Sequence, residues 1–589
     1  MGVRRPKGSF MALPNPSALS RKTFLKTAGA AGLAVGAAAA LPKWTMPSAA
    51  AQEDAPKGGL NILFVMVDQL RAPYVYMSPA MQKFVCPTIT KLADDGVRFD
   101  HYYTVSNDCT PARAAQVSGL YTHQIGIFGT TGDATLNAGV PTFGTALREQ
   151  GYDTYWFGKW HVTPSDVTGE GTVNGCMANP YEAYGFTVPD PAVGTCPSPD
   201  GGAGQGQFID PITRQQFREW LKKRPTGQKP WFATLSLINP HDIQFYPYYT
   251  RRIQGQQFPR QLYREMAANY ETNGQRKERR KPELQLSSVQ AHNDTFGDLP
   301  DEKRVEQPWR KMLDTYALMT NEVDLQIYSA LNELAKSPFA DNTIVVFTSD
   351  HGEYSGAHGM RGKGFSFYEE GSRVPLIVKD PTNTWTKDTK AARKQLFSSV
   401  DLGALFLTIA TGNDDWRNDP RYAHLKQRAD IAGALKDPQA KGRPYIAHAT
   451  DEVATLPPQL GGDGSTVYPG ANHITAIRTR IGKLARYAYW KDGGYEIDAA
   501  QGIEWEVYDY RTREGRMELD NIAYKPEAQQ FVRAMKKVLA HAMAKEIQAP
   551  LPSNLQAAQN AAFTTWFGDA TAIPPISPIT LDNFRKTVT

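Results

Sequence analysis

A thiol, a proline and an arginine stand close together near residue 110. Cys109 precedes Pro111 by two residues and Arg113 by four. A guanidinium can hold an anion through two parallel hydrogen bonds, and a nearby cation favours the thiolate form of a cysteine. The spacing therefore indicates an activated nucleophile at Cys109. A buried structural cysteine, or one in a disulfide, explains the same residues equally well.

Three apolar runs, which begin near residues 61, 231 and 343, end in polar residues. Asp68 ends the first, His241 follows the second, and Asp350-His351 follows the third. Unbroken apolar runs are typical of parallel strands that are covered on both faces. Because ligands bind beyond the carboxyl ends of such strands in open α/β sheets, we expect these side chains to meet in one site. Each residue alone is more often structural.

A cation and an imidazole lie two residues apart in the next motif, Gly158-Lys-Trp-His161. On an extended chain Lys159 and His161 point to the same face. Such a pair suits a site that binds an oxyanion and moves a proton. By itself the same pair is also typical of a surface strand.

Taken together, these segments resemble the type I sulfatases, arylsulfatase-like members of the alkaline phosphatase superfamily. Cys109-Thr-Pro-Ala-Arg113 matches the C-x-P-x-R motif of that family, and residues 151–161 are similar to its second motif. The resemblance covers nearly all of residues 60–525. It implies that a formylglycine-generating enzyme oxidises Cys109 to formylglycine (3-oxoalanine), and that the aldehyde hydrate is the nucleophile.

The resemblance also implies a divalent metal ion. Its ligands would be Asp68, the modified residue at Cys109, Asp350 and His351. Gln69 stands where the family has a second acid, so we expect it to be a neutral or outer ligand. Oxygen-rich sites favour Ca²⁺ or Mg²⁺, and the histidine admits Mn²⁺. Resemblance favours Ca²⁺.

The charge that develops during attack on sulfur suggests a role for each remaining candidate. Arg113 would hold the aldehyde hydrate through its fork of donors, and Lys159 and Lys363 would bind the sulfuryl oxygens. His241 would protonate the departing alcohol, and His161 would position the hydrate and assist breakdown of the sulfo-enzyme. The expected catalytic set is Cys109, Arg113, Lys159, His161, His241 and Lys363.

The predicted elements favour an α/β fold. We expect a large, mixed but mostly parallel sheet flanked by helices, as in alkaline phosphatases, and a smaller C-terminal antiparallel sheet with a helix. Residues 312–334 have apolar side chains at three- and four-residue spacing, which predicts a helix packed on the sheet. The predicted organisation is a catalytic sulfatase domain at 52–440 and a C-terminal α+β subdomain with a surface tail at 441–589.

Residues 1–51 are predicted to be a cleavable export signal. A basic head at 20–26 precedes an Ala/Gly-rich run at 28–41, and Ala49-Ala-Ala51 fits a cleavage site. The head resembles a twin-arginine signal with Lys22 in place of the second arginine, and an ordinary secretory signal is the alternative. We expect export machinery as a partner and a periplasmic or secreted protein. The run is too short to span a bilayer, so we expect no stable membrane span.

The charge and cysteine content narrow the interpretation further. The net charge of +5 comes from seven Lys or Arg in residues 1–51, which hold no acid, so the rest is slightly acidic and no nucleic acid partner is expected. Cys176 and Cys196, in a loop-rich insertion at 162–206, could form a disulfide and leave Cys86 as a free buried thiol. The basic stretch 276–281 indicates a solvated face or, less strongly, a contact with an anionic substrate.

We predict a sulfuric ester hydrolase that releases inorganic sulfate from a sulfated carbohydrate or another small organic sulfate. One alternative is a related hydrolase of phosphate or phosphonate esters, which the Asp68-Gln69 and Asp350-His351 pairs also suit. The other is a carbohydrate-binding homologue without turnover. An oxidisable cysteine argues against that last alternative, since binding alone has no use for it. Specificity would lie in residues 162–230 and 243–310.

Overall fold

The structure is a computed structural model. It describes residues 59–130, 135–163, 172–173, 176–177, 181–188, 206–247, 261–302, 304–452, 468–491 and 496–567. The export signal and the Cys176–Cys196 pairing, both predicted from the sequence, fall outside the residues whose side chains are described. Among the described helices, none combines the length and the apolar character that a membrane span requires.

The core of the molecule is a seven-stranded sheet in the order β3-β6-β1-β7-β8-β2-β9. Strand β8 runs antiparallel to β7 and β2, and the other neighbours are parallel. The mixed, mostly parallel sheet that the sequence predicts is therefore confirmed. The strands are β1 (Asn61–Asp68), β2 (Val97–Tyr103), β3 (Asp153–Gly158), β6 (Trp231–Pro240), β7 (Thr343–Ser349), β8 (Leu376–Lys379) and β9 (Arg393–Ser398).

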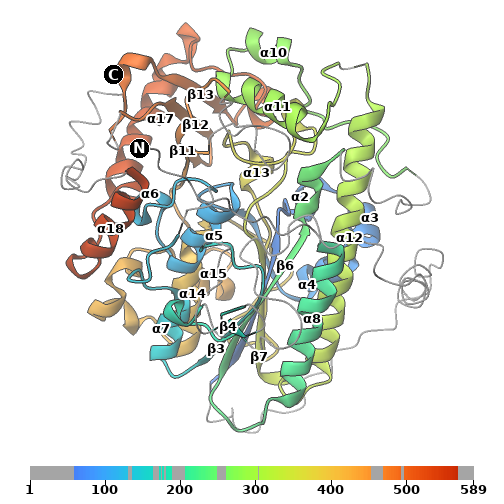
Figure 1. Cartoon of the computed structure of the whole chain (residues 1–589), viewed down its shortest axis with the longest axis vertical. Helices are drawn as coiled ribbons and strands as arrows, with labels where there is room; N and C mark the ends of the chain where they lie inside the picture. The colour runs from blue at the N-terminus through green and yellow to red at the C-terminus, as the bar shows by residue number, and fades with distance from the viewer. Residues whose placement is uncertain are drawn as a thin grey trace, which may run out of the picture.

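Helices cover both faces of this sheet (Figure 1). Successive side chains of a strand point to opposite faces, so an unbroken apolar strand needs a cover on each side. One face packs on α5 (Cys109–Ser118), α7 (Phe143–Glu149), α14 (Leu402–Thr411) and α15 (Ile431–Lys436). The other packs on α3 (Pro79–Val85), α4 (Pro87–Asp95), α8 (Gly206–Lys223) and α12 (Gln307–Ala335).

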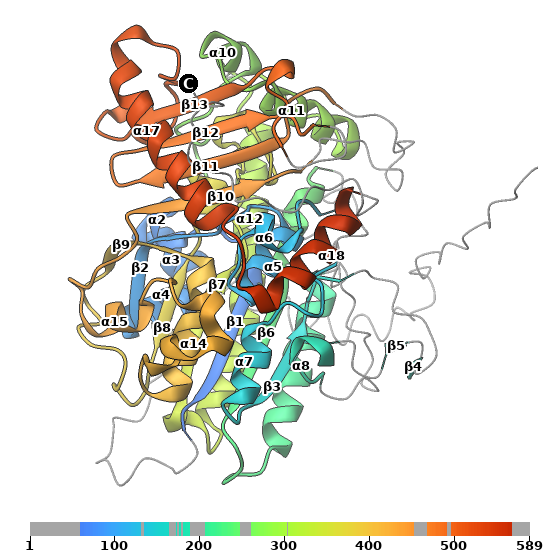
Figure 2. The ribbon, with the colours of Figure 1, turned by 90° about the vertical axis from the view of Figure 1, so that its left-hand side faces the viewer.

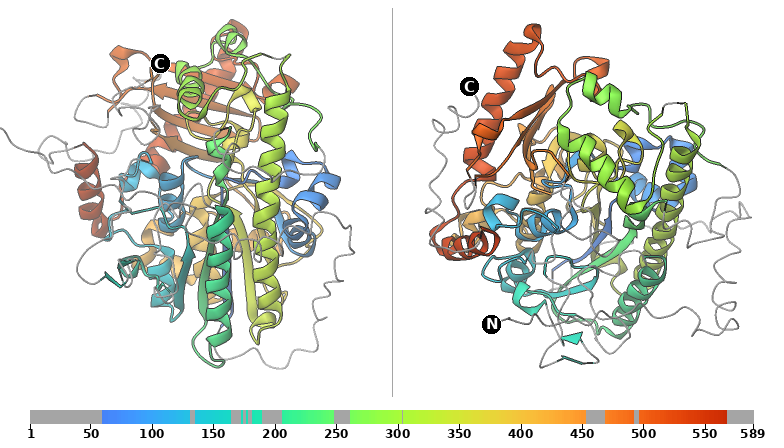
Figure 3. Two further views of the ribbon diagram at one scale, coloured as in Figure 1. Left: turned by 45° about the vertical axis from the view of Figure 1, so that its right-hand side comes forward. Right: turned by 45° about the horizontal axis from the view of Figure 1, so that its top comes forward.

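Helix α12 contains the amphipathic helix predicted at 312–334, and it lies beside α8 along the sheet (Figure 3). The apolar positions with this spacing are all buried, which confirms the predicted packing face. They are Met312, Tyr316, Met319, Val323, Ile327, Leu331 and Leu334. Shorter helices complete this part of the chain. They are α2 (Pro73–Tyr76), α6 (Thr122–Ile125), α10 (Asn273–Glu278), α11 (Glu283–Phe296) and α13 (Glu369–Ser372), with a two-residue pair β4 (Thr172–Val173) and β5 (Cys176–Met177).

A second, antiparallel sheet stands at the C-terminal end, with α17 across one of its faces (Figure 2). Its strands are β10 (Tyr445–Thr450), β11 (His473–Thr479), β12 (Gly482–Ala488) and β13 (Glu504–Asp509), followed by α16 (Arg513–Arg516) and α17 (Gln529–Ala542). The other face packs on the 354–368 loop and α11. The predicted sheet-plus-helix architecture is confirmed, and the boundary near residue 440 stays a prediction.

The predicted surface tail contains a helix. In this segment α18 (Gln556–Phe567) contacts α6. Alanine has the highest helix propensity, and Ala557, Ala558, Ala561 and Ala562 all lie in α18. The alanine-rich composition of the tail therefore favours a helix at this point.

Candidate active site

Four neighbouring strands bring the predicted site residues together. Strand β1 lies between β6 and β7 and is parallel to both, so Asp68, His241 and Asp350 reach the same edge of the sheet. Cys109 begins helix α5 at that edge, and its thiol is 3.8 Å from Asp68 Oδ1 and 3.2 Å from His351 Nε2. The convergence expected from the apolar runs is confirmed.

The atoms around the thiol have the chemistry of a metal site. One ligand-type atom from each of Asp68, Cys109, Asp350 and His351 lies within 4.8 Å of the others, and all four residues are buried. His351 Nδ1 donates to the carbonyl oxygen of Gly352 at 3.1 Å, which leaves the lone pair of Nε2 facing the cluster. Two carboxylates, one imidazole and an oxygen at position 109 fit a hard divalent ion.

Arg113 holds the two carboxylates of the site. Its Nε donates to Asp350 Oδ2 at 2.7 Å and its Nη2 to Asp68 Oδ2 at 3.0 Å. Its Nη1 donates to the carbonyl oxygen of Lys159 and to Ser236 Oγ. Arg113 therefore positions both carboxylates, a task that the sequence did not predict. The predicted contact between Arg113 and the hydrate stays a prediction.

Buried cations control the ionisation of the site. Burial and Cys109 both raise the pKa of Asp68, but Lys159, His241 and Arg113 outweigh them and hold it well below its usual value. Burial also opposes ionisation of Cys109, yet Lys159, Lys363 and His351 lower the pKa of the thiol well below its usual value. The pocket therefore stabilises negative charge at position 109.

Lys159 and His161 lie beyond the end of β3 rather than on it. The chain turns at His161, where φ is 58°, so the prediction that the two residues share one face of an extended strand is wrong. Both still reach the site. Lys159 Nζ is 2.7 Å from Asp68 Oδ2 and 3.7 Å from Cys109 Sγ. Burial and then Lys159 lower the pKa of His161 to about 4, so its imidazole is neutral at pH 7.

Lys363 reaches the site from a loop with left-handed glycines. Its Nζ donates to Gln69 Oε1 at 2.6 Å, and Gln69 Nε2 donates to Glu353 Oε2 at 2.5 Å. A Cβ on Gly364, where φ is +73°, would lie 2.5 Å from Asp108 Oδ1, beside Cys109. Glycine therefore lets the backbone of this loop pass close to Asp108.

His241 completes the set at the end of β6. It is 5% exposed, and its Nδ1 has no hydrogen-bond partner in the described residues and lies 3.7 Å from Asp242 Oδ1. Its charge helps to lower the pKa of Asp68. The predicted site residues thus gather in one cluster, on the ends of β1, β3, β6 and β7, the start of α5 and the 356–364 loop.

The sequence model of the sulfatase family matches residues 60–412, which is more than half of the chain and includes every one of these site residues. The chain belongs to the sulfatase family. This sulfatase is 25% identical over 519 residues to the N-acetylglucosamine-6-O-sulfatase of Bacteroides thetaiotaomicron, a match that covers 79% of this chain and 83% of the relative. Three other curated sulfatases are matched over only 62% to 63% of their length.

Solved structures share the fold of this sulfatase. The structure of BT1596, a 2-O GAG sulfatase, superposes with a TM-score of 0.60 at 20% identity and covers 82% of this chain and 92% of its own. A phosphonate monoester hydrolase from Silicibacter pomeroyi superposes with a TM-score of 0.58 at 21% identity, covering 84% and 96%. At these identities the likeness is one of fold.

The sulfatase pocket also contains groups that sequence reasoning missed. Asp108 accepts from Thr450 Oγ1 at 2.5 Å, and burial raises its pKa to about 6. Glu452 accepts from the Thr130 amide at 2.8 Å, and burial followed by Asp108 raises its pKa to about 8. Glu452 lies far from the motifs along the chain and left no local signal. Asp108, which directly precedes Cys109, and Glu353, three residues after Asp350, were within reach of motif reasoning.

Two predictions concern residues outside this pocket. Cys86 is a free buried thiol, as expected. Arg276 and Lys281 were expected on a solvated face or beside an anionic substrate, but they are 0% and 5% exposed. Arg276 donates to the carbonyl oxygen of His358, and Lys281 donates to two tyrosine hydroxyls and the carbonyl oxygen of Glu518. Both predictions for this stretch are wrong at these two residues, because Arg276 binds within the catalytic part and Lys281 joins that part to the C-terminal subdomain.

Proposed function

We propose that this sulfatase hydrolyses sulfuric esters and releases inorganic sulfate. The observation that carries the proposal is the position of Cys109. Its thiol lies 3.2 Å from His351 Nε2, 3.8 Å from Asp68 Oδ1 and 3.7 Å from Lys159 Nζ. A side chain in this position has ligand atoms on one side and a buried cation on the other, which suits an anionic ester that is attacked at its central atom.

We propose that Cys109 is converted to formylglycine. We also propose that the modified residue, Asp68, Asp350 and His351 bind a divalent metal ion, with Ca²⁺ as the preferred ion. When present, the aldehyde hydrate supplies a hydroxyl nucleophile and the metal ion supplies Lewis acidity. Support comes from the donor set, in which Arg113 takes one oxygen of each carboxylate and leaves the other towards Cys109. Burial of all four residues excludes competing water.

We assign the binding of the sulfuryl group to two lysines. Charge grows on the non-bridging oxygens as sulfur is attacked, and preorganised cations in a buried pocket stabilise it most. Lys159 and Lys363 are 1% and 7% exposed. Burial opposes the charge on Lys363, but Cys109 and Asp68 raise its pKa, so the lysine stays protonated at pH 7.

We assign the proton transfers to two histidines. His241 Nδ1 has no hydrogen-bond partner among the described residues, so it is free to give a proton to the departing alcohol oxygen. His161 interacts with Cys109, and its depressed pKa of about 4 keeps the imidazole neutral and able to accept a proton from the nucleophile. Arg113 acts through the carboxylates it holds.

The proposed substrate is a sulfated carbohydrate or another small organic sulfate. A sugar sulfate is also the substrate of the similar N-acetylglucosamine-6-O-sulfatase, as its name states. The second candidate is hydrolysis of phosphate or phosphonate esters. The fold of the phosphonate monoester hydrolase favours it, as does a site with an amide at Gln69 in place of a second acid.

The test is an activity screen of the purified mature protein against sugar sulfates, an aryl sulfate, choline sulfate and a phosphonate monoester. We expect release of inorganic sulfate, lost in Cys109→Ala. Faster turnover of the phosphonate ester would select the second candidate. Binding of sulfated sugars without turnover of any ester would make the chain a carbohydrate-binding homologue and would contradict the proposal.

We further propose that the export signal at 1–51 sends the folded chain to the periplasm or out of the cell. Oxidation of Cys109 by a formylglycine-generating enzyme would then precede export through the twin-arginine machinery. Cell fractionation tests this proposal. We expect the mature protein outside the cytoplasm and, after Arg21→Lys, retention of the unprocessed chain inside.

A further inference from the structure

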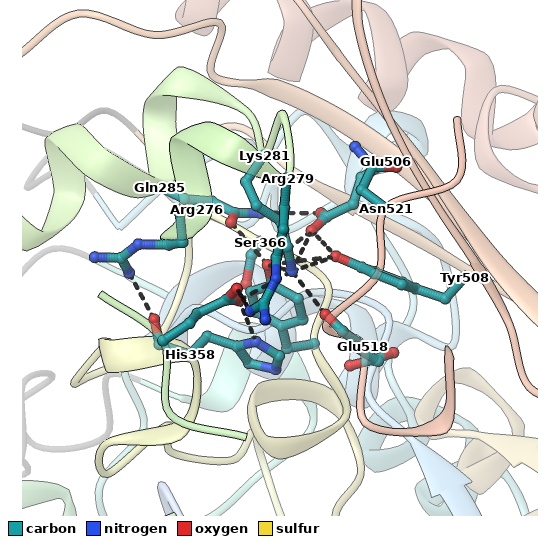
Figure 4. A network of polar contacts seen from close by, with 12 residues as sticks. Arg276, Arg279, Lys281, Gln285, His358, Ser366, Glu506, Tyr508, Glu518 and Asn521 are labelled. Carbon is teal, nitrogen blue, oxygen red and sulfur yellow. Dashed lines mark hydrogen bonds and ion pairs between the residues drawn. The ribbon is translucent and has the colours of Figure 1, made fainter. Parts of the chain in front are cut away.

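A second cluster of ligand-type side chains lies where the Lys363 loop meets the C-terminal sheet. His358 comes from that loop, Glu370 from α13 and Glu518 from the turn after α16. One ligand-type atom of each lies within 4.8 Å of the others. The three residues are 0%, 8% and 1% exposed. Figure 4 shows His358 and Glu518 entering one polar network from different segments.

His358 presents an accepting ring nitrogen to this cluster. Its Nδ1 lies 2.9 Å from Glu271 Oε1. Glu271 also forms ion pairs with Lys281 at 3.0 Å and Arg279 at 2.5 Å, so the group is a carboxylate that can only accept. Nδ1 therefore carries the hydrogen, and the lone pair of Nε2 faces Glu370. A histidine that gives its other N–H to a carboxylate is the usual form of a metal-binding histidine.

Glu370 supplies a carboxylate oxygen that no donor satisfies. Among the described residues its Oε2 has no hydrogen-bond partner, and it lies 3.8 Å from His358 Nε2. Lys281 pairs with Glu271, and Lys483 pairs with Glu518. Arg71 interacts with Glu370 through its charge, but its Nη1 donates to the carbonyl oxygen of Tyr354. Within the described residues, Glu370 forms no ion pair with a lysine or arginine. A buried carboxylate oxygen without a donor is costly, so it points to a ligand.

The amide of Asn269 marks the place where that ligand would sit. Its Nδ2 lies 3.0 Å from His358 Nε2, 2.9 Å from Glu370 Oε1 and 3.5 Å from the carbonyl oxygen of Met517. Three acceptors thus converge on a group with two N–H bonds. Turning this amide about its last torsion brings Oδ1 to the same position. Asn269 Oδ1 would then face His358 Nε2 and Glu370 Oε1, and a carboxylate oxygen of Glu518 lies within 4.8 Å of the ligand atoms of those two residues.

We propose that His358, Glu370 and Glu518 bind a divalent cation that is separate from the one at Asp68 and Asp350, with Asn269 Oδ1 as a further ligand. One imidazole with carboxylate oxygens suits Zn²⁺ better than Ca²⁺ or Mg²⁺, which take oxygen ligands almost exclusively. The ion joins the loop that carries Lys363 to the turn after α16. Its role is to fix both the loop and the packing of the C-terminal sheet.

The decisive experiment measures zinc binding rather than activity. The full-length Asp350→Asn chain, which lacks a ligand of the first site, is stripped with a chelator and titrated with Zn²⁺ by calorimetry. We expect one remaining equivalent to bind. Adding Glu370→Gln should weaken this binding roughly 100-fold, because a ligand is lost while the shape is kept. Glu278→Gln, an exposed carboxylate on α10, is the matched control and should leave binding unchanged.

Either of two results would overturn the site. One is a folded Asp350→Asn chain that binds no Zn²⁺, which would mean that a proton neutralises Glu370 instead. The other is unchanged affinity after Glu370→Gln. If a substituted chain fails to fold, wild-type crystals soaked in Zn²⁺ provide the test, through anomalous scattering at the zinc edge. We expect an anomalous peak between His358 and Glu370. The absence of this peak would contradict the proposed site. None of these readouts depends on ester hydrolysis.

Discussion

Lys363 Nζ donates a hydrogen bond to Gln69 Oε1 over 2.6 Å, at the position where the resembling family has a second acid. The Gln69 amide is fixed in this orientation, because its nitrogen donates to Glu353 Oε2. A carboxylate at position 69 would neutralise the lysine, whereas an amide orients it and leaves its charge for the substrate. Gln69 is therefore better described as a positioning residue than as a missing ligand.

The first prediction follows from this contact. Gln69→Glu places a second carboxylate against Glu353 and pairs it with Lys363, so kcat/KM should fall roughly 100-fold, about the cost of losing one oxyanion donor. Kinetics with an aryl sulfate measure the loss. Gln69→Met, which removes the acceptor without adding charge, should cost less. Equal activity of Gln69→Glu and wild type would show that Lys363 does not bind the sulfuryl group.

His241 should matter most for poor leaving groups. An alkyl or sugar alcohol needs a proton as it departs, while an activated phenol does not, and removal of a general acid typically costs ~10² to 10⁴ in rate. We expect His241→Ala to reduce kcat on sugar or alkyl sulfates far more than on 4-nitrophenyl sulfate. Equal losses on both substrates would assign His241 to binding, and His161 and Lys363 would then be the next acids to examine.

Activity should depend on a divalent metal ion. Asp68 and Asp350 direct oxygens to the same point as His351 Nε2, so chelation should abolish turnover, and Ca²⁺ should restore it better than Mg²⁺ or Mn²⁺. Elemental analysis of the restored protein identifies the ion. Full activity after exhaustive chelation, in protein without bound metal, would contradict this prediction.

Glu546 should make stability depend on acid pH. It accepts from Tyr121 OH, and its Oε2 lies 2.7 Å from Arg443 Nη1. Burial opposes ionisation, but Arg443 and Tyr121 lower the pKa to about 2 from an ordinary 4.5. A depressed carboxyl pKa stabilises the fold above the ordinary value, and this stabilisation is lost as the pH falls from 4.5 through 2.

Urea denaturation of Glu546→Gln and wild type checks this effect. At pH 7 the variant should be less stable by about 2–3 kcal/mol, and the difference should shrink as the pH falls below 4.5. Glu527→Gln, at an exposed position just before α17, should show neither effect. A difference that stays constant from pH 7 to pH 3 would mean that packing, and not the charge of Glu546, stabilises this contact.

Much of the site could be predicted because its residues follow strands with an unambiguous pattern. Asp68 and Asp350 end apolar runs that are buried on both faces, and parallel neighbours must bring such ends to one edge. The C-x-P-x-R motif at Cys109 is local and needs no tertiary information. These features also explain why the mostly parallel sheet and helix α12 were predicted correctly.

The contacts that were missed join residues far apart in the chain. Arg113 bonds to a carboxylate 237 residues away, and nothing local tells whether a guanidinium faces a substrate or a partner. Lys281 sits in a basic stretch that is normally solvated, yet it is buried against Tyr368 and Glu271 and against Tyr508 of β13. The composition of a segment shows how many charged side chains it has. Whether those side chains are buried depends on which other segments pack against them.

The central claim is that formylglycine, and not a thiol, stands at position 109. Mass spectrometry of the peptide that contains Cys109, from protein with measured sulfatase activity, tests it most directly. We predict a peptide with the mass of the aldehyde, reactive towards a hydrazide, in proportion to the activity of the preparation. A fully active preparation in which residue 109 is entirely unmodified cysteine would contradict the account.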